Sequence, residues 1–347
     1  MPSNNRAVIA AAGSLKTQMI IDEALADPSR RVLITTYTNE NLRQISARLA
    51  EQNAGVTPPN ITIMSWLAFV MNQCARPYQE SVLRDLHYMG TLNFDGKPHR
   101  GTPVANPHRY FFDAAHNLYR EHASQFAFLA NQYSDGLVID RLGDMFDHIY
   151  IDEIQDMAGY DLDLLDALFD SMIDVTVVGD PRQSTYFTTN ESRNKKYRGA
   201  GILQWFNERQ NTGVCEIENR AFSVRCNQEI CDFADDLFPK LPRTTSRNTE
   251  QTGHDGIFSI PRSEALDYFD QHKPMVLRYA ISSDTIGLPA INFGMSKGNT
   301  YDRVLIFPTQ PMVAYLKSKN LARAGSLEKF YVAVTRAKYS VAFAMPD

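Results

Sequence analysis

The stretch HIYIDEIQD, residues 148–156, passes from an apolar run into three acids and a glutamine within five residues. A buried strand that ends in carboxylates marks the edge at which α/β sheets place ligand chemistry. Adjacent Asp152 and Glu153 can divide the work of a nucleotide hydrolase, one holding Mg²⁺ and the other positioning or activating water. A solvated turn after a strand would have the same composition. The functional interpretation therefore requires a phosphate-binding loop elsewhere in the chain.

Residues 6–17 supply a candidate for that loop. A short buried strand is predicted at 6–10, the sequence AAGSLKT follows at 11–17, and a helical pattern opens at about Thr17. In this context the loop amides and the helix N-terminus face the phosphates, Lys16 bridges the terminal phosphates and Thr17 is a ligand of Mg²⁺. The glycine that normally precedes the lysine is replaced by Leu15, which brings a Cβ where the backbone usually bends sharply.

Strands and helices alternate along most of the chain, which predicts parallel sheets with crossover helices. The alternation stops between about 71 and 144, where aromatic-rich helical segments predict a helical subdomain with the aromatics in its core. We therefore expect an α/β fold with a helical insertion in the first α/β domain. The main strands are expected at 31–35, 61–64, 148–152, 175–178, 214–217, 274–279, 303–307 and 340–344.

Composition and charge narrow the class of protein. The 347 residues, 44% of them hydrophobic, can bury two cores, and the net charge of −5 leaves any nucleic-acid surface to a local patch. The four cysteines form no CxxC pair, which indicates free thiols in a reducing cytosol. The polar first six residues do not resemble a signal peptide, and no apolar run approaches the roughly 18 residues of a membrane span. We therefore expect a cytoplasmic globular protein with no membrane partner.

Two further polar segments follow the acidic strand end. The strand predicted at 175–178 ends in Gly179-Asp180, and Gln183 beyond it can hydrogen-bond a terminal phosphate or its attacking water. The run SRNKKYRGA, residues 192–200, is the most basic short segment of the chain. It suits single-stranded nucleic acid, with phosphates on the cations and a base on Tyr197, although a solvated basic loop would have the same composition.

Taken in order, these stretches resemble the UvrD/Rep/PcrA-like helicases of superfamily 1. Any single match of this kind can arise by chance, whereas seven in the family's order are a specific signal. The matching segments are 10–17 for motif I, 36–41 for motif Ia, 151–156 for motif II in its DExQD form, 179–186 for motif III, 223–225 for motif IV, 296–304 for motif V, and 331–338, YVAVTRAK, for motif VI.

The resemblance implies two RecA-like P-loop domains that hold ATP and Mg²⁺ between them and move 3′→5′ along single-stranded DNA. The implied catalytic residues are Glu153, Gln183, Arg225 and Arg336, the two arginines reaching the γ-phosphate as arginine fingers do. The implied nucleotide-binding residues are Ala12, Gly13, Ser14, Leu15, Lys16, Thr17 and Gln18, and the implied metal ligands are Thr17 and Asp152. The implied nucleic-acid contacts are Thr36, Thr38, Asn39, Trp66, Tyr197, Arg198 and Ser296.

The same resemblance places the first RecA-like domain at 1–195, with the helical insert at about 67–145, and the second at 196–347. Too few residues separate Arg225 from Gly294 for the family's large accessory subdomain, and Thr300 stands where the family has a ribose-binding Glu. The leading hypothesis is a compact helicase or translocase that acts on single-stranded DNA or partial duplexes, in DNA repair or phage defence. The alternative is a nucleotide-gated DNA-binding regulatory subunit, its ATPase weakened by Leu15, that controls a partner such as a nuclease.

Overall fold

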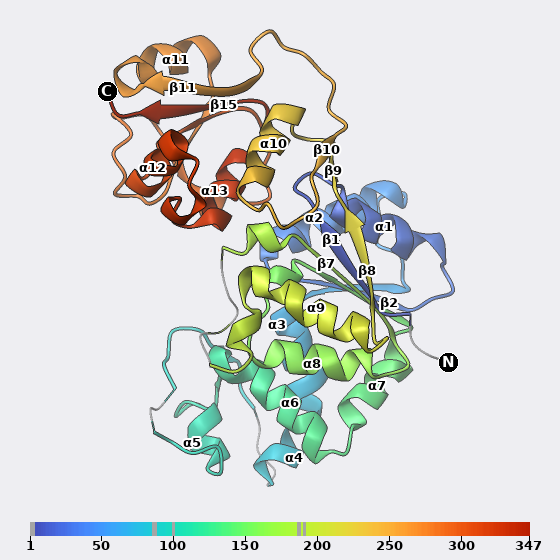
Figure 1. Cartoon of the computed structure of the whole chain (residues 1–347). Helices are drawn as coiled ribbons and strands as arrows, with labels where there is room; N and C mark the ends of the chain where they lie inside the picture. Colours follow the sequence, from blue (N-terminus) through green and yellow to red (C-terminus); the bar gives the residue numbers. More distant parts are fainter. Residues whose placement is uncertain (1–3, 85–88, 99–100, 186–188, 190–191) are drawn as a thin grey trace. The chain divides into compact units, whose positions relative to one another are not determined.

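The computed structural model describes residues 4–84, 89–98, 101–185, 189 and 192–347 (Figure 1). Contacts between residues divide the chain into two compact units, each built around a sheet with parallel strands. The first unit holds Met1–Val8, Thr17–Gly179 and Tyr186–Glu218, and the second holds Ile9–Lys16, Asp180–Thr185 and Asn219–Asp347. The predicted α/β class with parallel sheets is confirmed, and the predicted domain boundary at 195 stays a prediction.

The first unit contains a six-stranded sheet in the order β3-β2-β6-β7-β1-β8. The pairs β2–β3, β2–β6 and β6–β7 are parallel. All five residues of β6 are buried, and Ile149 and Ile151 are fully buried. A parallel strand that is covered on both faces needs a nearly continuous apolar sequence of this kind. The strands are β1 (Arg6–Ala10), β2 (Val32–Thr36), β3 (Ile61–Ser65), β6 (His148–Asp152), β7 (Asp174–Gly179) and β8 (Glu216–Arg220).

Four helices belong to the α/β part of this unit, namely α1 (Lys16–Ala26), α2 (Asn39–Gln52), α8 (Tyr160–Phe169) and α9 (Ile202–Asn211). The sequence offers Thr38 or Asn39 as the N-cap of α2, and in the structure the cap is Thr38, whose side chain accepts from the amide of Asn41 at 3.1 Å. Helices α8 and α9 lie side by side, as Figure 1 shows, and an ion pair of 2.6 Å joins Arg209 to Asp166.

The inserted region between β3 and β6 is helical, as predicted. It consists of α3 (Trp66–Phe69), α4 (Gln79–Leu83), α5 (Pro107–Phe111), α6 (Ala123–Tyr133) and α7 (Leu137–Met145), with a π-helix at Val70–Ala75 and a two-stranded pair of β4 (Leu92–Asn93) and β5 (Leu118–Tyr119). The buried rings of Phe111 and Phe126 meet edge to face with their centroids 5.0 Å apart. Phe111 and Phe126 therefore belong to a core, as expected, whereas Phe94 and Tyr133 of the same region are exposed.

The second unit contains a five-stranded parallel sheet in the order β11-β15-β14-β12-β13. Val304 and Ile306 of β14 face the core that also contains residues of α10, α12 and α13, whereas Leu305 faces α11, so helices cover both faces. The elements are β9 (Phe222–Ser223), α10 (Gln228–Asp236), β10 (Thr245–Ser246), β11 (Gly256–Pro261), α11 (Ala265–His272), β12 (Met275–Arg278), β13 (Ile291–Asn292), β14 (Tyr301–Ile306), α12 (Gln310–Ser318), α13 (Leu327–Val334) and β15 (Ala337–Met345).

Strand β8 differs from the sequence-based expectation. The strand predicted at 214–217 was expected to open the second α/β unit, but β8 is hydrogen-bonded into the first sheet beside β1. The amide of Glu216 donates to the carbonyl of Asn5 at 2.9 Å. Pairing of this kind joins segments about two hundred residues apart, so the local sequence pattern does not reveal it.

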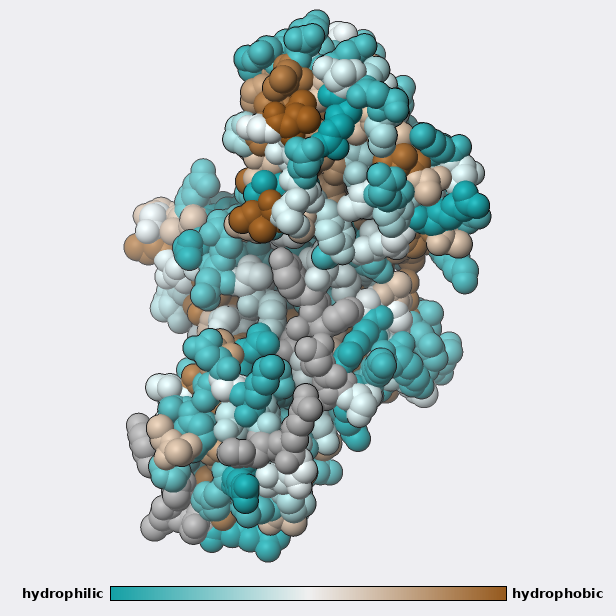
Figure 2. Space-filling view, turned by 90° about the vertical axis from the view of Figure 1, so that its left-hand side faces the viewer, coloured by the Kyte–Doolittle hydropathy of each residue, from teal (hydrophilic) through white to brown (hydrophobic). Residues whose placement is uncertain are grey.

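The surface agrees with the composition. No helix among the described residues is long and apolar enough to cross a membrane. On the face shown in Figure 2, the hydrophobic residues drawn in brown gather in small separate patches within a mostly hydrophilic surface. Exposed apolar side chains such as Ile281 and Met295 are thus scattered, which is normal for a folded chain.

His148, the first residue of β6, should make the stability of the fold depend on pH. The imidazole of His148 stacks on the ring of Tyr150, with centroids 4.0 Å apart, and shares a 2.9 Å hydrogen bond with the hydroxyl of Thr176. Burial lowers the pKa of His148 to about 4, with the nearby charge of Arg30 acting in the same direction. A histidine with a depressed native pKa stabilises the fold above its unfolded pKa, and this contribution is lost as the pH falls toward 4.

We predict that replacing His148 by Gln flattens the dependence of the free energy of unfolding on pH between 6.5 and 4. The wild-type chain should lose up to about 3 kcal/mol more than the variant over this range, because each pKa unit is worth about 1.4 kcal/mol. Urea titrations at several pH values measure the difference. Parallel curves for the two proteins would show that His148 is as easily protonated in the native state as in the unfolded chain.

Candidate nucleotide site

The phosphate-loop segment bends at Gly13 and Leu15 before α1 begins at Lys16. Gly13 has φ +77°, and a Cβ there would lie 2.6 Å from Ser223 Oγ and 2.7 Å from Arg225 Cβ, so only glycine fits. The carbonyl of Gly13 accepts from the amide of Val224 at 3.0 Å. The predicted motifs I and IV are therefore in direct contact within the second unit.

Leu15 takes the left-handed conformation, with φ 60°, that favours glycine. Its side chain is 47% exposed, so it fills no core. The hydroxyl of Ser14, by contrast, is buried and has no hydrogen-bond partner among the described residues. A buried hydroxyl left open in a loop of backbone amides can serve an anionic ligand.

The acidic strand end lies next to the start of α1 in the first unit. Thr17 Oγ1 donates to Asp152 Oδ2 at 3.0 Å, and the amide of Glu153 donates to Asp152 Oδ1 at 2.9 Å. Hydroxyl and carboxylate oxygens are the ligands that Mg²⁺ prefers, usually with one or two from the protein and the rest from water and phosphate. No group of three or more His, Cys, Asp or Glu side chains suited to a metal ion occurs among the described residues.

Glu153 is held in an uncommon conformation by its neighbours. Its φ is 62°, its side chain is buried, and its carboxylate accepts a hydrogen bond from the side-chain amide of Gln155. Gln155 in turn lies against the end of β7, because a Cβ on Gly179 would come within 2.3 Å of Gln155 Oε1. The predicted motifs II and III thus contact each other through a glycine.

Arg336 joins three of the predicted motifs within the second unit. Its buried guanidinium donates to Gln183 Oε1 at 3.1 Å, to the carbonyl of Val332 at 3.0 Å and to the carbonyl of Asn299 at 3.4 Å. Arg225, the other predicted arginine finger, donates to the carbonyl of Thr335 at 3.1 Å. Gln183 and Arg336 are therefore in direct contact, and Arg225 contacts the residue before Arg336, while their catalytic roles stay predictions.

Two groups that the sequence did not single out support this arrangement. The Tyr331 hydroxyl accepts from the amide of Ala12 at 3.2 Å, and burial keeps the pKa of Tyr331 well above its usual value. Arg182 forms buried ion pairs of 2.8 Å with Asp180 and 3.2 Å with Asp235. Burial lowers the pKa of Arg182, but the charge and hydrogen bond of Asp180, together with the nearby Tyr331 and Asp235, outweigh burial and raise it overall. The Asp-Pro-Arg turn at 180–182 could have indicated the pair of Asp180 and Arg182 from the sequence, but Asp235 lies far along the chain.

The predicted nucleic-acid residues fall into two groups. Thr38 and Asn39 are exposed at the start of α2. The side chains of the other five are at least partly enclosed: Thr36, Trp66, Tyr197 and Ser296 are buried, and Arg198 donates to the carbonyl of Thr189 at 3.1 Å. Gln18 bonds to Asp22 on α1, and Tyr186 of motif III lies outside the described residues. The roles of these residues stay predictions.

Comparisons with known proteins find similarity to helicases. The sequence profile of the UvrD/REP helicase N-terminal domain matches residues 110–195. Among solved structures, the arterivirus nonstructural protein 10 helicase superposes with a TM-score of 0.51 at 15% identity over 98% of this chain and 59% of its own. The complex of that helicase with DNA gives 0.50 at 14% identity over 98% and 60%. A search of curated proteins finds no significant match.

These similarities define a helicase-like α/β fold. The resemblance to the UvrD/REP helicases, predicted from the motifs, is confirmed over residues 110–195, and the solved structures show similarity of fold. The chain spans about three fifths of the length of the two viral structures.

The conformation of Leu15 predicts an unusual response to glycine. Leu15→Gly should leave the free energy of unfolding unchanged or raise it by up to about 1 kcal/mol, because relief of left-handed strain offsets the added freedom of the unfolded chain. Leu266, which is 49% exposed on α11, is the matched control, and Leu266→Gly should cost about 1 kcal/mol. Urea denaturation measures both. Equal losses in the two variants would show that Leu15 is not strained.

Proposed function

We propose that the chain is an ATP-driven motor of the cytoplasm that moves 3′→5′ along single-stranded DNA and separates partial duplexes. The observation that carries the proposal is the 3.0 Å contact between Thr17 Oγ1 and Asp152 Oδ2 directly after the phosphate loop. In P-loop NTPases a Thr and an Asp in these positions hold Mg²⁺ on the nucleotide phosphates. The matches to a helicase domain and to helicase structures support this class of activity.

The residues present fit ATP and Mg²⁺. Thr17 and Asp152 would hold the cation, and the open Ser14 hydroxyl and loop amides would face the phosphates. When bound, Mg²⁺ would neutralise charge on the transferring phosphoryl group. Lys16 would contact the terminal phosphates, as the Lys of a P-loop does.

Two kinds of residue would then act on the reaction itself. Glu153, buried and held by Gln155, would orient and deprotonate the attacking water. Arg225 and Arg336 would place positive charge opposite the developing phosphate charge, and Gln183 would report the state of the nucleotide to them through its bond to Arg336.

A second candidate function rests on Leu15 of the phosphate loop rather than on the acids Asp152 and Glu153. Leu15, strained at φ 60°, is compatible with a loop that binds nucleotide but turns it over slowly. The chain would then be a nucleotide-gated DNA-binding subunit that controls a partner such as a nuclease. Tight nucleotide binding with no measurable hydrolysis, with or without DNA, would favour the regulatory function over the motor. DNA repair and phage defence are settings in which either activity would serve.

The roles of the loop and the acids predict separable kinetic defects. Lys16→Ala should abolish ATP hydrolysis and its stimulation by single-stranded DNA. Glu153→Gln should lower kcat by roughly 10²- to 10⁴-fold while retaining nucleotide binding, because it removes only a general base. Lys273→Ala, which removes an exposed cation paired with Asp270, is the control. A wild-type ATPase that DNA does not stimulate, at the same rate as Lys16→Ala, would refute the proposal.

The proposed direction of movement has its own test. A duplex with a 3′ single-stranded tail should be unwound, or a blocking protein displaced from its end, faster than the same duplex with a 5′ tail. The rate should depend on ATP and vanish in Lys16→Ala. Faster action from the 5′ tail would reverse the proposed polarity without affecting the proposed ATPase.

A further inference from the structure

The phosphate loop is held by three hydrogen bonds, the tethers at residues 11, 12 and 13. The second unit contains both the loop segment, Ile9–Lys16, and the groups that bind it. Two tethers join main-chain atoms: the amide of Ala11 donates to the carbonyl of Arg220 at 3.1 Å, and the carbonyl of Gly13 accepts from the amide of Val224 at 3.0 Å. A change of side chain does not remove the atoms of these two bonds.

The third tether is different because a side chain supplies it. The amide of Ala12 donates to the hydroxyl of Tyr331 at 3.2 Å, between residues 319 positions apart in the chain. Ala12 and Tyr331 are 4% and 1% exposed, so water does not compete for this bond. A buried amide that loses its acceptor retains the cost of its desolvation, so this single hydroxyl matters to the loop.

The ring of Tyr331 is held firmly, which gives its hydroxyl a fixed position. The guanidinium carbon of Arg182 lies 5.0 Å from the ring centroid, and Phe238 meets the Tyr331 ring edge to face with centroids 5.7 Å apart. Arg182 is itself held by its buried ion pairs with Asp180 and Asp235. These contacts involve the ring and not the hydroxyl, so they persist when only the hydroxyl is removed.

Leu15 is the reason that the loop needs this support. Its φ of 60° is disfavoured for a residue with a Cβ and freely adopted by glycine. Its side chain is half exposed, so packing of Leu15 itself does not hold the conformation. Strained backbone persists only where its surroundings over-determine it. The tethers fix the chain on one side of Leu15, and helix α1, which begins at Lys16, fixes it on the other.

We propose that Tyr331 is a positioning residue for the nucleotide: its hydroxyl, by holding the amide of Ala12, keeps a phosphate loop that contains Leu15 in its binding conformation. The inference rests on the proposed function, since it takes the loop to bind the phosphates of a nucleotide. A loop with glycine at position 15 would reach the same conformation without this tether. Tyr331 thus compensates for the one residue of the loop whose side chain opposes the required backbone.

The test is a double-mutant cycle of Tyr331→Phe and Leu15→Gly in the full chain, with binding of ADP and Mg²⁺ measured by calorimetry. Tyr331→Phe should weaken ADP binding roughly tenfold, because affinity falls in proportion to the population of the competent loop. The KM for ATP should rise by the same factor, with kcat changed less than about twofold. In the Leu15→Gly background, Tyr331→Phe should weaken binding less than about twofold, so that the two changes are not additive.

Tyr315→Phe is the matched control. Tyr315 is also a buried tyrosine of the second unit, and its hydroxyl forms no hydrogen bond with a described residue. This variant should leave ADP binding unchanged in both backgrounds. Amide hydrogen exchange of the nucleotide-free chain reports the tether directly: peptides that cover residues 11–15 should exchange faster in Tyr331→Phe than in the wild type, and at the wild-type rate in Tyr315→Phe.

Two results would overturn the inference. Unchanged affinity for ADP in Tyr331→Phe, or unchanged exchange of the loop amides, would show that the hydroxyl does not hold the loop. An equal loss of affinity with Leu15 and with Leu15→Gly would show that the hydroxyl acts independently of the strained residue. Failure of the proposed function is a separate outcome: a wild-type chain that binds no nucleotide would contradict it, and loop exchange would still decide whether Tyr331 holds the loop.

Discussion

The buried guanidinium of Arg336 is the group on which the arrangement of the candidate site depends. A cation taken out of water is tolerated only if its donors meet acceptors, because an unpaired buried charge is strongly destabilising. At 1% exposure, Arg336 finds acceptors on Gln183, Val332 and Asn299, which belong to three segments separated along the chain. One desolvated side chain thereby fixes how the loop after β7, helix α13 and the segment before β14 lie together.

Two glycines set a complementary constraint by allowing backbone and side chain to approach closely. A Cβ at Gly13 would overlap Ser223 and Arg225, and a Cβ at Gly179 would overlap Gln155. At Gly13 the left-handed φ of +77° also favours glycine. The glycines are needed because a segment distant in sequence occupies the space of a side chain, so the contacts between motifs I and IV and between II and III depend on the absence of two methyl groups.

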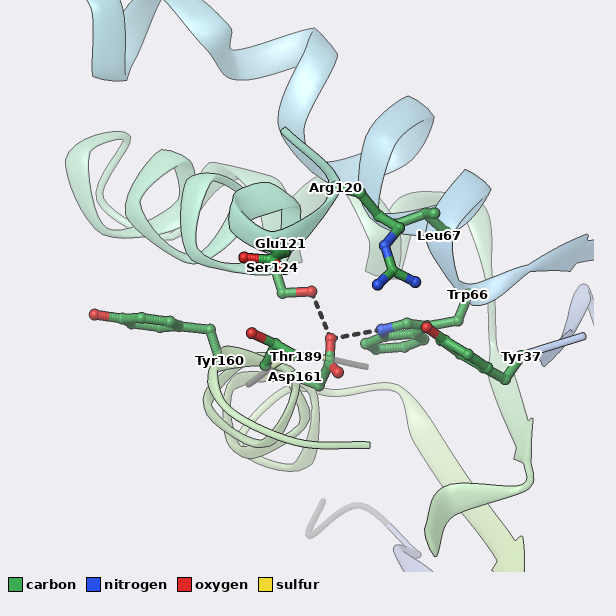
Figure 3. A pocket seen from close by; sticks show the side chains of 9 residues that line it. All are labelled: Tyr37, Trp66, Leu67, Arg120, Glu121, Ser124, Tyr160, Asp161 and Thr189. Carbon is green, nitrogen blue, oxygen red and sulfur yellow. Dashed lines mark hydrogen bonds between the residues drawn. The ribbon is translucent and has the colours of Figure 1, made fainter. Parts of the chain in front are cut away.

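The sequence was sufficient where structure is local and insufficient where it depends on distant partners. The apolar run 6–10 and the cap at Thr38 match β1 and α2 because buried strands and helix starts have short-range signatures. The pairing of β8 with the first sheet and the ion pair of Arg182 with Asp235 involve partners far along the chain. Motif matches located Trp66 among the predicted nucleic-acid contacts, but only packing shows that its ring is enclosed and hydrogen-bonded to Asp161 (Figure 3).

Left-handed backbone at Glu153 and at Leu15 has two different physical meanings. The backbone N–H of Glu153 donates to the Asp152 carboxylate, and the Glu153 carboxylate accepts from the side-chain amide of Gln155. Several contacts therefore support the uncommon φ of 62° at Glu153. Strain that the surroundings maintain in this way is characteristic of a group positioned for chemistry. Leu15 has a similar φ, but its side chain is half exposed and buries little. The fold therefore requires the conformation at Glu153, whereas at Leu15 it accommodates a residue in a place suited to glycine.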